Sequence, residues 1–422
     1  MKILHISTKD LEGGSARAAN RLHQGLKKLN IDSQMLVQTK ASDDRTVIAP
    51  QTLVEKSLAK FGGIVDTIPP KLYLRHRQIS FSTQWLPDGI YPRIARLNPN
   101  LINLHWIHNS HLRIETLAKL KLPIVWTLHD MWAFTGGCHY DGDCGKYVES
   151  CGACPLLKSD RDWDLSRWIW QRKSQAWKNI DLTIIAPSKW LAECASSSSL
   201  FRNTRVEVIP NGLDLQRYKP IERQIVRSLL NLPQNKQLVL FGAIKATSDR
   251  RKGFHLLEAA LQSLCQSEWQ DKIELIVVGA SQSDNRADLG FKTHYLGKLN
   301  DDISLAQVYA AADVFVAPSL QDNLPNTVVE AIACGTPSVA FKIGGMPEII
   351  KHQHNGYLAR PFEVEDLAKG IAWILENRER HRTICWFARE KAEREFSQEL
   401  QAHRYASIYN NLFSDNLNCR LA

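Results

Sequence analysis

The chain has 422 residues, of which 44% are hydrophobic and 23% are charged, and its formal net charge is +9. This composition is that of a folded globular protein and argues against a disordered or fibrous chain, while the length predicts two or three domains. The positive charge favours anionic partners, but no Lys/Arg block, zinc-finger spacing or aromatic RNA-binding signature accompanies it, so we expect no nucleic-acid partner.

The first residues, MKILHIST, form a short apolar run that Lys9, Asp10 and Glu12 follow at once. This run lacks the apolar core of a signal peptide, and nowhere do about 18 apolar residues stand together as a membrane-spanning helix requires. We therefore expect a cytoplasmic protein whose membrane contact, if any, is peripheral at the inner face.

Short β-branched runs alternate with stretches of helical periodicity, which is the pattern of parallel sheets covered by helices. The fold class is therefore α/β, with two successive doubly wound, Rossmann-like domains. We predict strands at 2–7, 33–38, 101–105, 124–128 and 182–186 in the first half, and at 237–242, 273–279, 293–296, 313–317 and 338–341 in the second half.

The segment VIPNGLDLQRYKP, residues 208–220, carries the turn formers that a hinge between domains requires. We predict an N-terminal domain over 1–208 and a C-terminal domain over 209–395. Residues 363–413 read as three helices, and we expect the last, over 396–422, to cross back and dock on the first domain.

Gly13 and Gly14 follow the first predicted strand and precede an Ala-rich helix, so they could form a phosphate or acceptor loop. Their pattern, GGSARA, departs from the dinucleotide fingerprint G-x-G-x-x-G, and no acidic residue closes the second strand near Gln38. A dinucleotide-dependent oxidoreductase is therefore the weaker alternative. The alternative to a binding loop is a tight turn whose backbone conformation requires glycine.

His129 and Asp130 close an apolar strand, a place where α/β proteins often display substrate-facing side chains. A satisfied core histidine is the alternative for His129. His105 and His108, in the string NLHWIHN, have a weaker case.

Four cysteines lie close together in the loop after this strand. Thiolates at this spacing could close a structural zinc site, with one C-x-x-C as its tight pair. Because only one such pair is present, disulfides and packed free thiols remain alternatives. The four candidate ligands are Cys138, Cys144, Cys151 and Cys154.

Four tryptophans at 163–177 are interleaved with arginines and a lysine. Such a segment could rest on an anionic membrane that carries a lipid-linked acceptor. The alternative is that most of these tryptophans belong to the core.

The stretch 317–350, APSLQDNLPNTVVEAIACGTPSVAFKIGGMPEII, reads as strand, loop, helix, strand, Gly-Gly turn and helix. A helix that begins at the carboxyl end of a parallel strand offers N–H groups and a positive dipole end to a sugar diphosphate. Glu330 could accept hydrogen bonds from a ribose diol, and Asp322 would face the sugar. Gly344 and Gly345 let a backbone approach the ligand closely.

A second cluster, GAIKATSDRRKG at 242–253, begins where a strand ends and finishes where a helix begins. Lys245, Arg250, Arg251 and Lys252 could neutralise a departing diphosphate, a stabilisation that is often the largest catalytic contribution. A solvated charged turn is the alternative.

The Asp322-x7-Glu330 segment, with EAIACGTPSVAF through it and GGMPEII after it, resembles the signature of retaining glycosyltransferases of family four. The fold of that family is called GT-B. Supporting matches are Gly13-Gly14, TLHD at 127–130, PNGLD at 210–214 and Lys252-Gly253. The resemblance covers nearly the whole chain, and the strings ATSDRRKGF and QDNLPNTVVEA are similar to a subgroup associated with bacterial exopolysaccharide assembly.

The resemblance implies two domains that face a central cleft, the N-terminal one (1–208) on the acceptor side and the C-terminal one (209–395) binding the nucleotide sugar. It also implies a hexosyltransferase-type enzyme that moves a sugar from a nucleoside-diphosphate sugar to a hydroxyl of a glycan or lipid-linked acceptor, with retention and without a required cofactor. Two departures, Asp322 in place of Glu and Ala243 in place of Arg, leave open a non-catalytic sugar-nucleotide-binding subunit.

The residues carried over from the family fall into two groups. Lys252, Arg251, Asp322 and His129 would act on the reacting sugar and the diphosphate. Glu330 would bind the ribose, and the remaining donor or phosphate contacts would come from Arg250, Asn323, Leu324, Gly13 and Gly14.

Overall fold

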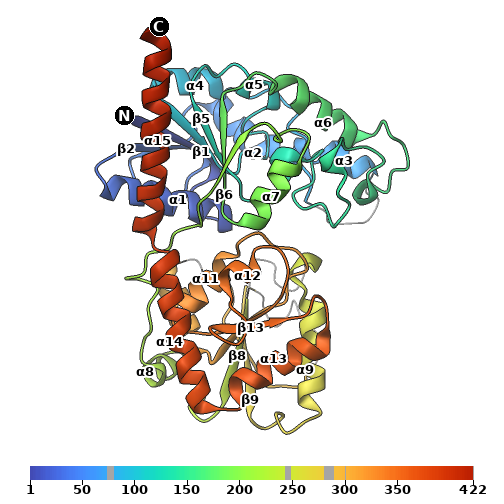
Figure 1. The fold of residues 1–422 in the computed structure, drawn as a ribbon, viewed down its shortest axis with the longest axis vertical. Coiled ribbons are helices and arrows are strands. Elements are labelled where there is room, and N and C mark those ends of the chain that lie inside the picture. The colour runs from blue at the N-terminus through green and yellow to red at the C-terminus, as the bar shows by residue number, and fades with distance from the viewer. Residues whose placement is uncertain (74–79, 243–248, 280–288, 300, 422) are drawn as a thin grey trace. The chain divides into compact units, whose positions relative to one another are not determined.

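The computed structural model describes residues 1–73, 80–242, 249–279, 289–299 and 301–421 (Figure 1). The chain divides into two compact units, of which unit 1 comprises 1–210 together with 401–422, and unit 2 comprises 211–400. Each unit has a parallel β-sheet of its own. The predicted α/β class with two parallel-sheet domains is thus confirmed.

Unit 1 is built on a seven-stranded sheet in the order β3-β2-β1-β4-β5-β6-β7, and its described strand pairs are all parallel. The strands are β1 Lys2–Lys9, β2 Asp32–Thr39, β3 Val47–Ile48, β4 Leu101–Leu104, β5 Ile124–Thr127, β6 Leu182–Ala186 and β7 Arg205–Val208. The α-helices between them are α1 Gly14–Lys28, α2 Leu53–Asp66, α3 Ile68–Tyr73, α4 Ile90–Leu97, α5 Ile114–Leu117, α6 Leu165–Ala176 and α7 Lys189–Ser197.

Successive residues of a strand point to opposite faces of the sheet, and in this sheet both faces are buried. Leu4 and Ile6 of β1 pack in one cluster with Trp126, whereas Ile3 packs on the other side with Leu101. Strands buried on both faces read as continuous apolar runs, and this is why the central strands were predictable from sequence.

The last helix, α15 Gln398–Leu421, packs on unit 1 beside β1 (Figure 1). Tyr405 Oη lies 2.9 Å from Thr127 Oγ1 on β5, and Asn103 Nδ2 on β4 donates to Tyr409 Oη over 2.7 Å. Both tyrosines are fully buried. These two polar contacts fix the register of the helix on the sheet.

Unit 2 is built on a six-stranded parallel sheet in the order β10-β9-β8-β11-β12-β13. Its strands are β8 Gln237–Gly242, β9 Ile273–Val278, β10 Thr293–Tyr295, β11 Val314–Ala317, β12 Ser338–Phe341 and β13 Gly356–Ala359. Its α-helices are α8 Arg223–Leu229, α9 Phe254–Cys265, α10 Asp302–Ala311, α11 Asn326–Ala333, α12 Met346–Ile349, α13 Val364–Leu375 and α14 Arg378–Glu395.

In each sheet the strand order reverses at the first strand of the unit: β1 lies between β2 and β4, and β8 lies between β9 and β11. Open α/β sheets bind their ligands outside the carboxyl ends of the strands at such a reversal. The loops after β1, β4, β8 and β11 are therefore where a functional site is expected. Within the described residues, no helix is both long and apolar enough to cross a membrane.

Candidate functional site

In unit 2, two charged loops meet at the strand reversal. Lys252 ends a short 3₁₀ turn, Arg250–Lys252, that precedes α9, and Asp322 lies in the loop after β11. Lys252 Nζ donates to Asp322 Oδ2 over 2.7 Å, and Arg251 Nη1 lies 3.5 Å from the same oxygen. The structure thus brings together three of the residues that the sequence singled out.

The Asp322 carboxyl group is buried, and burial alone would raise its pKa. The adjacent Lys252 and Arg251 cations outweigh burial and hold the pKa at about 2. Ser319 Oγ also donates to Asp322 Oδ2, over 3.2 Å. Asp322 is therefore ionised at neutral pH, and the local charge is two cations around one carboxylate.

Glycines hold these loops at close range. Gly253 has φ +71°, and a Cβ there would overlap the Pro318 carbonyl oxygen. Gly344 has φ +49°, and its Cβ would overlap the carbonyl oxygen of Asp322, which also accepts a hydrogen bond from Gly345 N over 3.2 Å. Only residues without a side chain fit this approach.

Glu330 lies on α11 and is buried, with Oε2 accepting a hydrogen bond from Tyr309 Oη over 3.1 Å. Asn323 and Leu324, between Asp322 and α11, are buried as well, whereas Arg250 is exposed. The basic residue Lys245 and the departure Ala243 lie outside the described residues.

In unit 1, three histidines form a chain across neighbouring strands, of which His5 and His105 are buried and His129 is half-buried. His5 Nδ1 on β1 lies 3.0 Å from His105 Nε2, and His105 Nδ1 lies 3.1 Å from His129 Nε2. Burial lowers the pKa of His129 to about 4, against the opposing effect of Asp130. It holds the pKa of His5 and His105 well below the ordinary value, with neighbouring histidines acting in the same direction.

Each ring of this chain is thus neutral and carries one proton. Both N–H···N bonds must then run in the same sense, either from His5 toward His129 or in reverse. Within the described chain the other nitrogen of His5, Nε2, is buried without a hydrogen-bond partner. The tautomer of His129 is consequently tied to that of His5.

Gly13 and Gly14 lie between β1 and α1. Gly13 has φ +102°, which favours glycine, and its carbonyl accepts a hydrogen bond from Arg17 N over 3.0 Å as α1 begins. The turn lies at the carboxyl end of β1, on the same sheet edge as His105 and His129.

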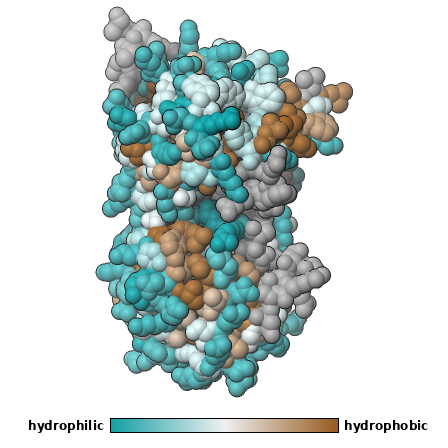
Figure 2. Space-filling view, turned by 90° about the vertical axis from the view of Figure 1, so that its right-hand side faces the viewer, coloured by the Kyte–Doolittle hydropathy of each residue, from teal (hydrophilic) through white to brown (hydrophobic). Residues whose placement is uncertain are grey.

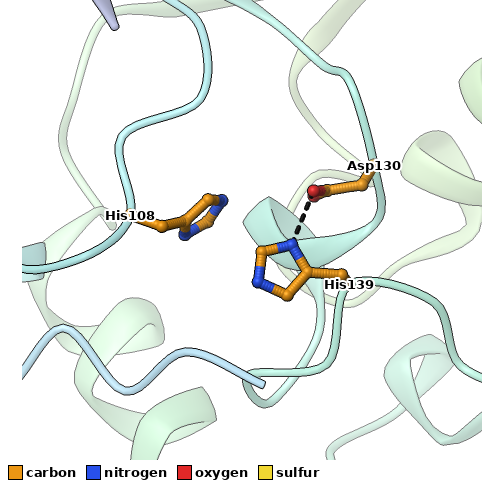
Figure 3. A group of neighbouring side chains, drawn as sticks. All are labelled: His108, Asp130 and His139. Atoms are coloured by element: carbon orange, nitrogen blue, oxygen red, sulfur yellow. Dashed lines mark hydrogen bonds and ion pairs between the residues drawn. The ribbon is translucent and has the colours of Figure 1, made fainter. Parts of the chain in front are cut away.

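A second polar group on this edge was largely missed from sequence. His108 follows β4, Asp130 follows β5, and His139 lies further along the same loop (Figure 3). Burial would raise the pKa of Asp130, but the nearby His139 holds it well below the ordinary value. Burial lowers the pKa of His108. The available signal was that polar residues follow two neighbouring parallel strands.

The four loop cysteines are all free thiols, and burial raises their pKa values, that of Cys151 to about 12. Cys151 Sγ accepts a hydrogen bond from Gly136 N over 3.1 Å. Among the described residues, no three of these sulfur atoms lie within 4.8 Å of one another. The potential ligand atoms of His108, Asp130 and His139 do lie within that distance. Disulfides do not join the cysteines.

The basic tryptophan segment is only partly inside unit 1, since Trp163 and Trp168 are exposed. Trp177 and Lys173 are buried, and Lys173 Nζ donates to the carbonyl oxygens of Trp132 and Thr135. Arg172, at the same end of α6, is bound to Glu115 at 2.7 Å.

Comparisons with known proteins agree with this architecture. Residues 12–217 match the family model described as glycosyltransferase family 4, and residues 235–377 match glycosyl transferases group 1. The two parallel-sheet units are those of the GT-B class. The chain belongs to the group 1 and family 4 glycosyltransferases.

The chain is 31% identical over 192 residues to D-inositol 3-phosphate glycosyltransferase of Segniliparus rotundus, which is 43% of this chain and 41% of that protein. It is 22% identical to the putative colanic acid biosynthesis glycosyl transferase WcaC of Escherichia coli K12, over 98% of this chain and 100% of WcaC. HepE of Anabaena, solved with UDP and glucose, has a TM-score of 0.65 at 20% identity, over 97% of this chain and 99% of that chain. The chain spans about half the length of several other curated relatives.

Proposed function

We propose that this protein transfers a glycosyl group, with retention, from a nucleoside-diphosphate sugar to an acceptor hydroxyl. The observation that carries the proposal is the Lys252–Asp322 pair at the β8/β11 reversal, inside the region that matches group 1 glycosyl transferases. This edge of the sheet is where an open α/β sheet binds its ligand.

The donor diphosphate would lie against Lys252 and Arg251. As the glycosidic bond breaks, negative charge grows on the leaving diphosphate, and fixed cations stabilise that charge more than they stabilise the bound donor. Because Lys252 already pairs with Asp322, a diphosphate must take over part of that contact. Asp322 would then be available to the sugar.

Glu330 would accept hydrogen bonds from the ribose, and Tyr309 fixes its carboxylate from inside the unit. In this proposal Asn323 and Leu324 contact the nucleotide sugar, and the exposed Arg250 adds a phosphate contact. A structural zinc site in the four-cysteine loop would require its thiols to move closer together on binding, since in the described part of the chain no three of their sulfur atoms lie within 4.8 Å of one another, and it would play no part in the chemistry.

Unit 1 would hold the acceptor, with His129, Gly13 and Gly14 as its ligand-facing residues at the carboxyl edge of the sheet. The full-length similarity to WcaC supports a place in the biosynthesis of a cell-surface polysaccharide. An acceptor of that kind is a growing glycan or a lipid-linked sugar.

We place the peripheral membrane contact on α2 and α3, where large apolar side chains are exposed beside Lys56, Lys60 and Lys71. Figure 2 shows apolar surface of this kind in brown at the upper right. Exposed apolar groups interleaved with lysines suit an anionic lipid surface. The exposed side chains are Leu53, Leu58, Phe61, Ile64, Ile68, Leu72 and Tyr73.

The test is a thermal-shift titration with UDP, GDP, ADP and TDP, followed by donor turnover with the nucleotide that binds. UDP is the first choice because the HepE structure holds it. A ligand that binds only the folded state raises the melting temperature. Lys252→Ala should lose most of the shift, whereas Lys272→Ala, at an exposed lysine paired with Glu268, should keep it.

Two other results are informative. Tight nucleotide binding without donor hydrolysis or transfer would support the alternative of a sugar-nucleotide-binding subunit. No shift with any of the four nucleotides, in a folded preparation, would contradict a donor site in unit 2.

A further inference from the structure

We propose that His108, Asp130 and His139 form a binding site for one divalent transition-metal ion of the zinc class. One nitrogen of each imidazole and one carboxylate oxygen lie within 4.8 Å of one another. The three side chains come from the loops after β4 and β5, and their polar ends converge on one point (Figure 3).

The first argument is the surplus polar capacity of His108. Its side chain is buried, and within the described chain its Nδ1 has no hydrogen-bond partner. The ring lies edge-on between Trp106 and Trp132, with both centroids 4.5 Å away, and 4.4 Å from the ring of His139. Burying an imidazole nitrogen without a hydrogen-bond partner costs free energy, and a bound ligand would offset that cost.

The second argument is that the other two side chains are already oriented from behind. Asp130 Oδ2 accepts from Trp106 Nε1 over 3.0 Å, and Oδ1 accepts from Trp132 N over 2.9 Å. Ser82 Oγ lies 2.9 Å from His139 Nε2, which leaves Nδ1 directed at Asp130. Metal-binding histidines and carboxylates are held by outer hydrogen bonds of this kind.

The contact between His139 Nδ1 and Asp130 Oδ2, at 2.6 Å, shows what the ion would replace. A proton bridges these two atoms when no ion is bound. Metal binding at Nδ1 would shift that proton to Nε2, where Ser82 Oγ can accept it, and would spread Nδ1 and Oδ2 slightly apart, so that His139 binds as a neutral imidazole. A buried cation, Lys173, directs its ammonium to the carbonyl oxygens of Trp132 and Thr135 and not to Asp130.

The donor set decides the kind of ion. Two imidazoles and one carboxylate suit Zn²⁺, Co²⁺ or Fe²⁺, whereas Mg²⁺ and Ca²⁺ prefer oxygen ligands alone. Three protein ligands leave a fourth position for a water or another oxygen ligand. The site differs from the cysteine loop, which would bind through sulfur, and from the donor loops of unit 2.

The test uses the full chain, stripped with a chelator and titrated with Co²⁺. The expected result is one Co²⁺ that shows visible d–d bands and survives the double change Cys151→Ser and Cys154→Ser. His139→Ala and Asp130→Asn should abolish this binding. Ser82→Ala should weaken it by about tenfold, because it removes only an outer hydrogen bond. His111→Gln, at a buried histidine outside the group, should leave it intact.

X-ray absorption on zinc-loaded wild-type protein guards against variants that fail to fold. The first shell should contain nitrogen and oxygen scatterers. An all-sulfur shell, no bound Co²⁺, or binding unchanged by both His139→Ala and Asp130→Asn would overturn the proposal. None of these readouts depends on glycosyl transfer.

Discussion

Replacing Lys252 by alanine tests the donor site most directly. The pKa of Asp322 falls from 3.8 to about 2, and a difference of one in pKa corresponds to about 1.4 kcal/mol. The net effect of burial, of the Lys252 and Arg251 cations and of the Ser319 hydrogen bond on this carboxylate therefore stabilises the folded state by about 2 kcal/mol. We expect Lys252→Ala to cost about 1 to 2 kcal/mol of unfolding free energy.

The effect on catalysis should be larger. Lys252 would face a charge that develops as the bond breaks, so kcat should fall by about 10², or about 2.7 kcal/mol. Affinity for the free nucleoside diphosphate should fall as well. Asp322→Asn should act on affinity in the opposite direction, because it releases Lys252 from its ion pair.

The assay combines calorimetric titration of the nucleoside diphosphate with steady-state turnover and a urea melt for each variant. If Lys252→Ala and Asp322→Asn lower nucleotide affinity equally, the pair is structural and the reasoning is refuted. The stabilisation from Asp322 also has a pH signature. Because its folded pKa is depressed, the contribution is complete above about pH 4 and is lost as the pH falls through 2.

Three further outcomes are expected. Glu330→Gln should raise KM, tenfold for each ~1.4 kcal/mol lost, with a smaller change in kcat, since ribose contacts exist before and during reaction; equal loss in both constants would contradict that role. Anionic vesicles should retain the protein at low salt and release it as added salt screens the lysine charges within about 8 Å. Phe61→Ser with Leu72→Ser should reduce retention at every salt concentration. Sedimentation that is unchanged by these substitutions would show that the membrane contact lies elsewhere. If metal analysis finds a sulfur-bound zinc, Cys151→Ser with Cys154→Ser should remove it, whereas a zinc-free preparation that is fully folded would leave packed thiols.

The central strands were predictable because strands buried on both faces are continuous apolar runs. The three strands that were missed, β3, β7 and β13, are all at sheet edges. β3 has two residues, β7 is partly exposed and β13 begins with Gly356, so their apolar signal is weak.

The meeting of Lys252 with Asp322 could be predicted for a similar reason, since both follow neighbouring strands. The partnership of His108 with His139 could not. The loop after β5 has no periodicity, and its path is set by tertiary contacts such as that between Ser82 and His139. Nor could sequence tell that the apolar face of α2 and α3 stays exposed, because periodicity identifies a face without saying what covers it.

The docking of α15 on unit 1 has a consequence for the order in which the protein folds during synthesis. Thr127 and Tyr405 are 278 positions apart, and Asn103 and Tyr409 are 306 apart. All of unit 2 must be synthesised before Tyr405 and Tyr409, which hydrogen-bond to side chains of β5 and β4, are available. Until α15 has been synthesised, one apolar face of the unit 1 sheet therefore remains exposed to solvent. Contacts between residues this distant in sequence also form slowly. Unit 2 is one continuous segment of the chain, so it can finish folding first. A stop codon ahead of Gln398 would remove α15 and leave that face of the unit 1 sheet permanently uncovered.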